Sequence, residues 1–161
     1  MHVRKLEQKD LARVSSICVK AFMHSVAPTL SDEGVDTFRG IASADSFSNR
    51  MKNDNTILVY EEGGEIKGVI ELKEGRHVAM LFVDPDFQKR GVGTELVSAV
   101  MPYARVEIIT VSASLNSVPA YLQYGFVCNG KPDEKAGLKY QPMVLQLNKS
   151  SKNDALKRAS S

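Results

Sequence analysis

Residues 77–101 read HVAMLFVDPDFQKRGVGTELVSAVM, and this stretch decides the fold. Its first part, His77–Val83, is almost wholly apolar, which is typical of a strand near the middle of a sheet that is covered on both faces. Asp84-Pro85 ends the strand, and apolar residues then recur at helical spacing. The stretch therefore predicts a buried strand, a loop and an amphipathic helix from Gly93 to about Met101.

The loop between this strand and this helix reads Gln88-Lys89-Arg90-Gly91-Val92-Gly93-Thr94. Glycines let the backbone approach a ligand closely, and the first amides of a helix are free donors at its positive end. Lys89 and Arg90 add charge, so the loop predicts a phosphate-binding site. The plainer alternative is a tight strand-to-helix turn with two solvated basic residues.

Two other phosphate-binding loops do not fit this segment. A Walker loop needs Gly-Lys-Ser/Thr after four spacer residues, and a dinucleotide fingerprint needs three glycines and a downstream acid in a βαβ unit. Neither pattern occurs in the sequence. The remaining pattern, Gln-x-x-Gly-x-Gly at the start of a helix, resembles the hallmark of the GNAT N-acetyltransferase superfamily.

A second feature, downstream of the loop, strengthens the resemblance. Asn116 is followed by Ala120-Tyr121-Leu122-Gln123-Tyr124-Gly125-Phe126, similar to the family's asparagine and its helix with a tyrosine four residues before Gly-Phe. Ala120 stands where a large apolar residue is usual, and Tyr124 replaces a common aliphatic. The resemblance covers residues 1–147 and is strong over residues 77–126.

The resemblance implies an acetyl-CoA site built from three segments. The backbone of Leu81, Phe82 and Val83 is expected to bind the pantetheine arm where the central strands splay apart. Asn116 is expected to touch the same arm. The pyrophosphate is expected on the loop amides of Gln88, Lys89, Arg90, Gly91, Val92, Gly93 and Thr94.

The resemblance also implies direct attack of an amine on the thioester in a ternary complex. Tyr121 is then the expected general acid, and an amide near Phe82 or Val83 the oxyanion donor. Glu71 is the first candidate for a general base because it interrupts an apolar strand beside the presumed cleft, although alternation with Lys67 and Lys73 fits a solvated face equally well. His77 is the next candidate base, although a histidine at the start of a strand also fits a structural role. His24 is expected either to line the acceptor pocket or to lie on the exposed surface.

The rest of the chain predicts an α/β fold of the α+β type, with a mixed, mostly antiparallel sheet flanked by helices. Short apolar patterns predict strands over residues 2–6, 56–61, 66–72, 106–112, 126–129 and 138–147. Asp10 is the expected N-cap of a first helix, and further helices are expected from Ser31, over 43–52 and over 117–124. We expect one domain over residues 1–147 and a polar tail over 148–161.

Composition limits the partners of the chain. Its 161 residues carry a formal net charge of +2, which does not favour nucleic acid or an anionic membrane as the main partner. The N-terminus has no apolar stretch of a signal peptide, and two cysteines, Cys18 and Cys128, make no disulfide framework or metal quartet. We expect a cytoplasmic protein without a bound metal.

Three hypotheses follow from the sequence. The first is an acetyl-CoA-dependent N-acetyltransferase acting on a primary amine, and the alternatives are a non-catalytic acyl-CoA sensor and, more remotely, a nucleic-acid-binding module. Acceptor specificity is expected from residues 22–52 and from the turn around 131–138. The strand over 138–147, if it lies at an edge of the sheet, offers a surface for a homodimer.

Overall fold

The computed structural model describes residues 2–25 and 30–147, which form a single α/β domain. The strands are β1 (Val3–Lys5), β2 (Asn55–Glu62), β3 (Glu65–Lys73), β4 (His77–Val83), β5 (Ile108–Ser114), β6 (Val127–Cys128), β7 (Asp133–Lys135) and β8 (Leu138–Gln146). The α-helices are α1 (Leu11–Ser25), α2 (Asp32–Ile41), α3 (Ala44–Met51), α4 (Val92–Val100) and α5 (Val118–Gln123). Short 3-10 turns are η1 (Gln8–Asp10), η3 (Pro85–Phe87), η4 (Met101–Tyr103) and η5 (Leu115–Ser117).

The strands form one sheet in the order β1-β2-β3-β4-β5-β8-β6, and β7 also pairs with β8. Every described pairing is antiparallel except β4 with β5, which confirms the expected mixed, mostly antiparallel sheet. The parallel pair is short, with partners only at His77↔Thr110 and Val78↔Val111. Beyond these two positions β4 and β5 are no longer paired with each other. β4 remains paired with β3, and β5 remains paired with β8.

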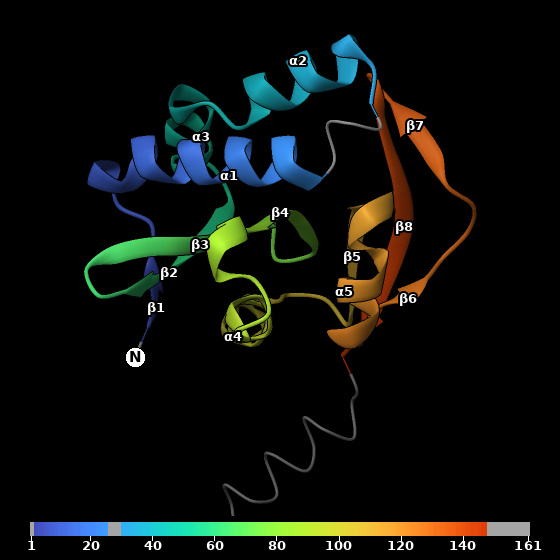
Figure 1. Ribbon diagram of the computed structural model, residues 1–161. Helices are drawn as coiled ribbons and strands as arrows, with labels where there is room; N and C mark the ends of the chain where they lie inside the picture. The colour runs from blue at the N-terminus through green and yellow to red at the C-terminus, as the bar shows by residue number, and fades with distance from the viewer. Residues whose placement is uncertain (1, 26–29, 148–161) are drawn as a thin grey trace, which may run out of the picture.

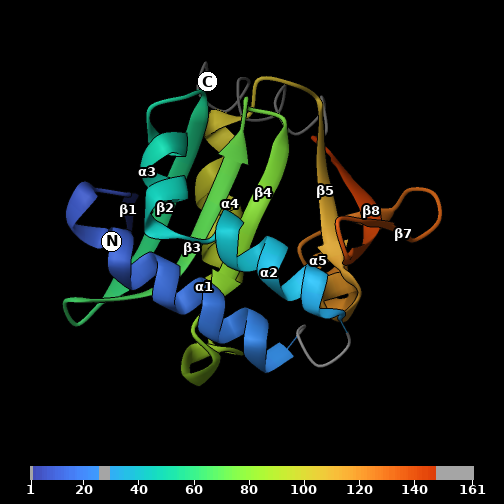
Figure 2. The same cartoon turned by 90° about the horizontal axis from the view of Figure 1, so that it is seen from above.

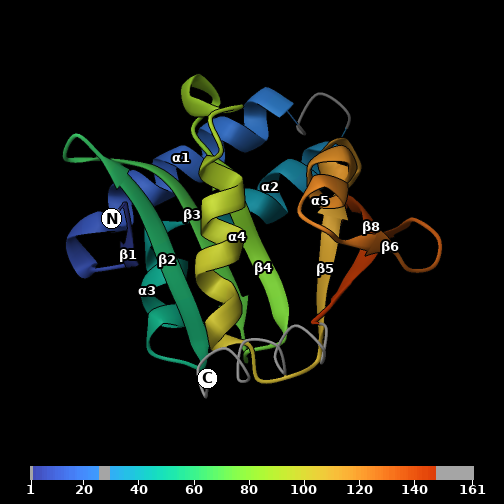
Figure 3. The ribbon, with the colours of Figure 1, turned by 90° about the horizontal axis from the view of Figure 1, so that it is seen from below.

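Helices cover both faces of this sheet (Figure 1). α1, α2 and α3 lie on one face (Figure 2), and α4 crosses the opposite face with α5 beside β5 (Figure 3). Each face buries its own apolar cluster, one centred on Leu96 and Ile70 under α4, the other on Ile17 and Phe47 under α1 and α3. Burial of these two clusters holds the three layers together.

The hairpin between β2 and β3 is confirmed. Gly63 and Gly64 both have positive φ, 62° and 80°, as a primed turn requires. The strands pair from Glu62↔Glu65 to Asn55↔Lys73, with a register shift near Tyr60. This hairpin supplies β3, on which β4 is aligned.

Three expectations about local structure are wrong. Asp10 does not cap α1: it ends η1, is buried, and binds Arg4 at 2.8 and 3.0 Å while accepting from Glu7 N. A turn was expected around residues 131–138, but Asp133–Lys135 of this segment form the strand β7, which pairs with β8. β8 is not an edge strand, since β5 covers one side of it and β6 and β7 the other, so the edge argued for a homodimer is absent.

β4 differs from the expected strand that is buried on both faces. Val78 and Met80 are buried, but Ala79 is exposed and Leu81 is half-buried. The reason is that two cavities open on this strand, as described below. The predicted tail over residues 148–161 lies outside the described residues, and within the described part no helix is long and apolar enough to span a membrane.

Candidate active site

The N-terminus of α4 presents main-chain donors beside β4. Gly91 is its N-cap with φ +83°, a left-handed conformation that glycine adopts without strain, and a Cβ there would meet no atom within 4 Å. Glu95 N donates to Gly91 O at 3.0 Å, which closes the first turn. The amides of Val92, Gly93 and Thr94 precede that bond and have no carbonyl within the helix to bind. They form a positively polarised end that suits an anion.

Gly93 serves a different purpose from Gly91. Its conformation is not left-handed, but a Cβ at this position would lie 2.1 Å from Tyr124 Oη and 3.0 Å from Tyr124 Cζ. Glycine is therefore required here because the Tyr124 ring packs against the helix. The sequence interpretation attributed both glycines to the approach of a ligand.

A cavity of about 340 Å³ extends from this helix end along β4 to η5 and α5. Its lining includes most of the residues expected to bind the cofactor, namely Leu81, Phe82, Val83, Gln88, Lys89, Gly91, Val92, Gly93, Thr94 and Asn116. Arg90 is the exception, because its guanidinium lies over the Phe87 ring, 4.7 Å from the centroid. Lys67 Nζ also lies near this ring, at 4.1 Å. We call this cavity the loop cleft.

An ionic network attaches the loop to α1. Asp84 is 3% exposed and accepts from Lys20 Nζ and Arg13 Nη2, each at 3.1 Å, and from Asp86 N at 3.0 Å. Lys20 also reaches the Asp86 carboxylate at 2.9 Å. Burial alone would raise the pKa of Asp84, but the Asp86 amide and the Lys20 and Arg13 cations together lower it. This network fixes the chain just before the loop and was not anticipated from the sequence.

The edge of β4 that faces away from β3 offers main-chain groups to the loop cleft. Asp84 N donates to Lys67 O of β3 at 2.8 Å, and main-chain groups of an antiparallel strand alternate in direction. Phe82 therefore turns its N–H toward β3, whereas Leu81 and Val83 turn theirs away. Consistent with this, Val83 O accepts from Gln88 Nε2 at 3.5 Å.

Asn116 joins the two walls of the loop cleft. It lies in η5, and its Nδ2 donates to the carbonyl oxygen of Ser25 at the end of α1. Both residues line the cleft. The side chain expected to contact a ligand therefore already bridges α1 and η5.

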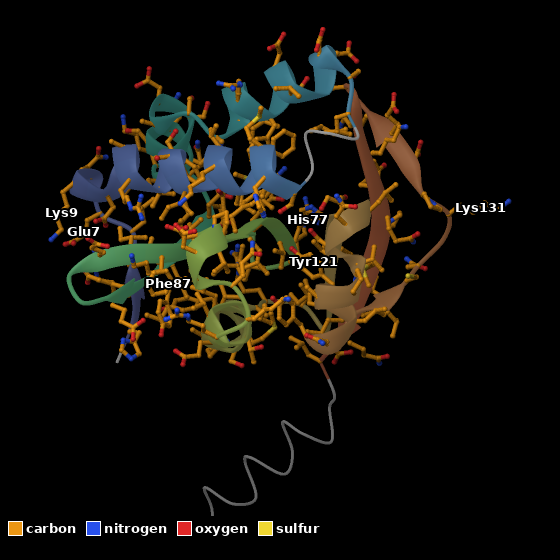
Figure 4. All side chains as sticks on the ribbon, viewed as in Figure 1. Glu7, Lys9, His77, Phe87, Tyr121 and Lys131 are labelled. Carbon is orange, nitrogen blue, oxygen red and sulfur yellow. The ribbon has the colours of Figure 1, made fainter. Side chains whose placement is uncertain are left out.

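Tyr121 belongs to α5, lies on the side of that helix toward β4 (Figure 4), and is 6% exposed. Its ring packs edge-on against Tyr124 and Phe126, with centroids 5.7 and 5.3 Å away. Burial, with a smaller contribution from Tyr124, raises the pKa of Tyr121 above its ordinary value. Among the described residues its hydroxyl has no hydrogen-bond partner. The raised pKa keeps it protonated at neutral pH, so it is available as a donor.

A second cavity of about 510 Å³ lies on the α2 side of β4 and β5. It shares four lining residues with the loop cleft, Leu81, Phe82, Ser117 and Tyr121. Both segments expected to select the acceptor contribute to it, through Phe22, Leu30, Thr37, Phe38 and Ile41 and through Lys135, Ala136 and Leu138. Lys139 and Tyr140 of β8 add to its wall, whereas Lys131 points away from the domain (Figure 4). We call this cavity the acceptor cavity.

Glu71 does not border either cavity, contrary to expectation. It is 0% exposed, and Arg50 Nε of α3 binds its two carboxylate oxygens at 3.0 and 2.8 Å. Burial raises the pKa of Glu71, and Arg50 offsets part of that effect. The alternative expectation, a solvated face shared with Lys67 and Lys73, is wrong for Glu71 and for Lys67, which is 8% exposed. The role of Glu71 as a base stays a prediction that the geometry does not support.

The two histidine candidates also lie outside the cavities. His77 Nδ1 is 2.7 Å from Thr110 Oγ1, and burial followed by the charges of Arg76 and Lys73 lowers the pKa of His77. His24 is exposed and is not part of either lining. In the part of the chain that the structure describes, no group of three or more His, Cys, Asp or Glu side chains is placed to hold a metal ion. Cys18 is buried and Cys128 exposed, both as free thiols.

The chain resembles known proteins in both sequence and fold. The acetyltransferase (GNAT) domain model matches residues 26–147. A GCN5-related N-acetyltransferase from Rhodopseudomonas palustris is 25% identical, with a TM-score of 0.80 over 90% of this chain and 94% of that one. The putative acetyltransferase yncA from Salmonella typhimurium, solved with acetyl-CoA, is 25% identical, with a TM-score of 0.68 over 91% and 94%.

A more distant structure shares the fold. The PaiA N-acetyltransferase from Thermoplasma acidophilum, solved with coenzyme A, is 19% identical, with a TM-score of 0.74 over 89% of this chain and 97% of that one. No curated protein matches the chain. The family model covers well over half of the 161 residues, and the chain therefore belongs to the GNAT acetyltransferase family.

Proposed function

We propose that this protein transfers the acetyl group of acetyl-CoA to a primary amine by direct attack in a ternary complex. The observation that carries the proposal is the junction of the two cavities at Leu81, Phe82, Ser117 and Tyr121. A donor in the loop cleft and an acceptor in the acceptor cavity would meet at these residues, beside a protonated hydroxyl.

The loop cleft fits acetyl-CoA in both its charge and its open strand edge. The first amides of α4 and the Lys89 side chain would hold the pyrophosphate, while Leu81 and Val83 would bind the pantetheine amides as an added strand does. Asn116 would exchange its bond to Ser25 for one to the same arm. Arg90, which lies over Phe87, would contribute long-range charge rather than direct contact. When bound, acetyl-CoA supplies the thioester that is the acyl donor.

Protein groups at the junction can serve each step of the transfer. The amine nitrogen forms a bond to the thioester carbon, and the N–H of Leu81 or Val83 stabilises the charge that develops on the carbonyl oxygen. The carbon–sulfur bond then breaks with its electron pair on sulfur, and Tyr121 donates its proton to that thiolate. Because burial raises the pKa of Tyr121, the tyrosinate is a strong base and regains a proton from the acylated nitrogen. The net result moves one proton from the amine to the thiol.

The alternative of a non-catalytic acyl-CoA sensor requires only the loop cleft. The acceptor cavity of about 510 Å³, joined to that cleft at Tyr121, favours the enzyme. The two hypotheses differ in turnover: an enzyme releases thiol from acetyl-CoA when a suitable amine is present, and a sensor binds acetyl-CoA without releasing thiol across a broad amine panel.

Tyr121→Phe tests the assigned chemistry. We expect the variant to lose about a hundredfold or more of kcat, because a positioned general acid contributes that much, while its dissociation constant for acetyl-CoA stays near that of the parent. Tyr103→Phe is the matched control, since Tyr103 is an exposed tyrosine of η4 outside both linings. A Tyr121→Phe variant with undiminished kcat would refute the role of the hydroxyl, and failure of the parent to bind acetyl-CoA in calorimetry would refute the whole proposal.

A further inference from the structure

The described linings of the two cavities contain no side chain that takes a proton from an ammonium group at neutral pH. No Asp, Glu or His of the described chain borders the loop cleft or the acceptor cavity. The titratable side chains that line them are Lys89, Tyr121, Tyr124, Lys135, Lys139 and Tyr140. Phenols and ammonium groups ordinarily titrate near pH 10, so they hold their protons at pH 7. An acceptor must therefore arrive already as a neutral amine.

The pKa of the acceptor then decides how often it can react. At pH 7 about a tenth of a peptide α-amine with a pKa near 8 is neutral, against about 0.04% of a lysine-like amine near 10.4. The neutral fractions differ by about 200-fold. In a free amino acid the adjacent carboxylate favours the charged ammonium form and so raises the pKa of the amine. The lining therefore favours an α-amine whose carboxyl group is held in an amide bond.

β5 points main-chain groups into the acceptor cavity. Thr110 N donates to Arg76 O at 3.0 Å, so the main-chain groups of Thr110 point toward β4. Directions alternate along a strand, so the main-chain groups of Ser112 and Ser114 point the same way. Both serines line the acceptor cavity, and neither lines the loop cleft.

These groups lie beyond the pairing of β4 with β5, which ends at Val78↔Val111. On the other side of β5, Pro142 stands opposite Ser112 in the register with β8. Pro142 has no N–H, and its carbonyl oxygen accepts from Asn129 N at 2.9 Å, away from β5. The Ser112 carbonyl and the Ser114 N–H thus face the acceptor cavity with no strand beside them. We call these two groups the β5 edge, and an extended peptide can bind such an edge as an added strand does.

The floor of the acceptor cavity is apolar and aromatic. Phe22 and Phe38 stack with ring centroids 3.9 Å apart, and Phe82 meets Phe38 edge-on at 5.2 Å. All three line the cavity of about 510 Å³, and Phe82 also lines the loop cleft. The floor therefore reaches the junction of the two cavities. It suits an uncharged, apolar side chain attached next to the reacting amine.

The charged side chains of the described acceptor lining, Lys135 and Lys139, form no joint site. The β7–β8 register places Lys135 opposite Leu138 and Lys139 opposite Glu134, so the two lysines lie on opposite faces of the hairpin. They do not converge on one carboxylate, and no acidic side chain of the described lining would hold a second ammonium group. The cavity thus suits a substrate that is uncharged around its amine.

We propose that the acceptor is the N-terminal α-amine of a peptide chain whose first residue has an apolar side chain. This inference rests on the proposed acetyl transfer and names its substrate class. The first side chain packs on the phenylalanine floor, the main chain after it binds the β5 edge, and the α-amine reaches the thioester beside Tyr121. Solvent takes one proton from the ammonium group before attack. The nitrogen bonds to the thioester carbon, the carbon–sulfur bond breaks, and Tyr121 protonates the thiolate and regains a proton from the acylated nitrogen.

The test measures thiol release from acetyl-CoA with matched acceptors at pH 7. The panel contains Leu-Gly-Gly-Gly, tetraglycine and the blocked peptide acetyl-Gly-Lys-Gly-Gly, each as its C-terminal amide, together with leucinamide, leucine and spermidine. We expect kcat/KM for Leu-Gly-Gly-Gly to exceed that for the blocked lysine peptide by about a hundredfold or more, following the neutral fractions. It should exceed the values for leucinamide and tetraglycine by about tenfold, because the first lacks the following main chain and the second lacks the side chain.

The pH profile shows whether the pKa of the acceptor governs the reaction. kcat/KM for Leu-Gly-Gly-Gly should rise about tenfold per pH unit and level off near pH 8, whereas for the blocked lysine peptide it should rise up to about pH 10. Burial raises the pKa of Tyr121, so the general acid keeps its proton over this range. A base on the protein would instead give both acceptors the same midpoint.

Ile41→Asn tests the apolar part of the site. Ile41 lines the acceptor cavity from α2 and is 39% exposed, so a polar residue is tolerated there. We expect the ratio of kcat/KM for Leu-Gly-Gly-Gly to that for tetraglycine to fall by about threefold or more, through a higher KM for the leucine peptide. Val106→Asn is the control, since Val106 is 37% exposed and outside both linings, and its ratio should not change. Equal melting temperatures verify that both variants are folded.

The outcomes separate the two proposals. Preference for the blocked lysine peptide, spermidine or leucine, with acetyl-CoA bound and thiol released, overturns the peptide α-amine as acceptor and leaves the acetyltransferase proposal intact. Leucinamide as good as the peptide, or one pH midpoint for both peptides, overturns it in the same way. An unchanged ratio in Ile41→Asn overturns the assignment of the apolar floor. Failure to bind acetyl-CoA, or to release thiol with any amine, overturns both proposals.

Discussion

Replacement of Gly93 by alanine tests whether this glycine serves the packing of Tyr124. The new Cβ would lie 2.1 Å from Tyr124 Oη, more than 1 Å inside the separation of about 3.5–4.0 Å at which nonbonded carbon atoms rest. The ring or the helix must move, and overpacking of this kind costs about 1–3 kcal/mol. For a chain of this size we expect the melting temperature to fall by about 2–4 °C for each kcal/mol.

The matched second change is Tyr124→Phe. The Tyr124 hydroxyl has no hydrogen bond among the described residues, so its loss alone should cost little. In the double variant the nearest contact of the new Cβ is ring Cζ at 3.0 Å, which a shift of a few tenths of an ångström relieves. We therefore expect the two changes to couple by about 1–2 kcal/mol in the free energy of unfolding, measured by urea denaturation of all four proteins. Additivity within about 0.5 kcal/mol would show that the hydroxyl is not what excludes a side chain at position 93.

Coenzyme A binding by the same four proteins separates packing from ligand contact. If Gly93 is needed only for Tyr124, the affinity lost in Gly93→Ala returns in the double variant, because the helix end regains its position. If the ligand itself needs the space above Gly93, the double variant binds as poorly as the single one. Calorimetric titration with coenzyme A distinguishes these results.

Two further predictions concern single side chains. Gly91→Ala should cost about 1–2 kcal/mol of stability in urea denaturation, because φ is +83° while the space around the new Cβ is open, and an unchanged stability together with unchanged coenzyme A affinity would contradict this. Removal of a general base lowers kcat by about a hundredfold or more. Because Glu71 lies outside both cavities, we expect kcat of Glu71→Gln to fall by far less than that. Burial raises the pKa of Glu71, so the folded form holds the proton more tightly than the unfolded form, and the parent should lose stability as pH rises from about 4.5 through the raised pKa. Glu71→Gln should remove that part of the pH dependence, and a slope identical to that of the parent would show that Glu71 is not its source.

The sequence predicts the local features of this protein well. The β2–β3 hairpin follows from two adjacent glycines, and the loop before α4 follows from a glycine that must adopt positive φ next to free helix amides. In such segments the conformation is decided by residues within a few positions of one another. Ten of the eleven residues expected at the cofactor site accordingly line one cavity.

The features that sequence reasoning missed depend on partners far along the chain. Alternation in β3 could not show that Arg50, from α3, would cover Glu71 and bury it. Arg90 is a local exception, because Phe87 stands only three positions before it, and the spacing alone did not indicate that the guanidinium would lie over that ring. Lys20 and Asp84, 64 positions apart, form the network that positions the loop, and neither carries a local signal of it.

The loop cleft and the acceptor cavity also differ in whether their residues are close together or far apart in the sequence. This difference decides which part of the site a family motif can predict. The loop cleft is assembled mainly from one continuous stretch, β4 to α4, so a motif that is short in sequence specifies it. The acceptor cavity instead combines α1, α2, β5 and the β7–β8 hairpin, which meet only after the whole sheet has formed. A substitution in any of those elements can change the lining without disturbing the loop. Membership of the family therefore argues strongly for the acyl donor, whereas the acceptor has to be inferred from the charges and rings that this chain places around its own cavity.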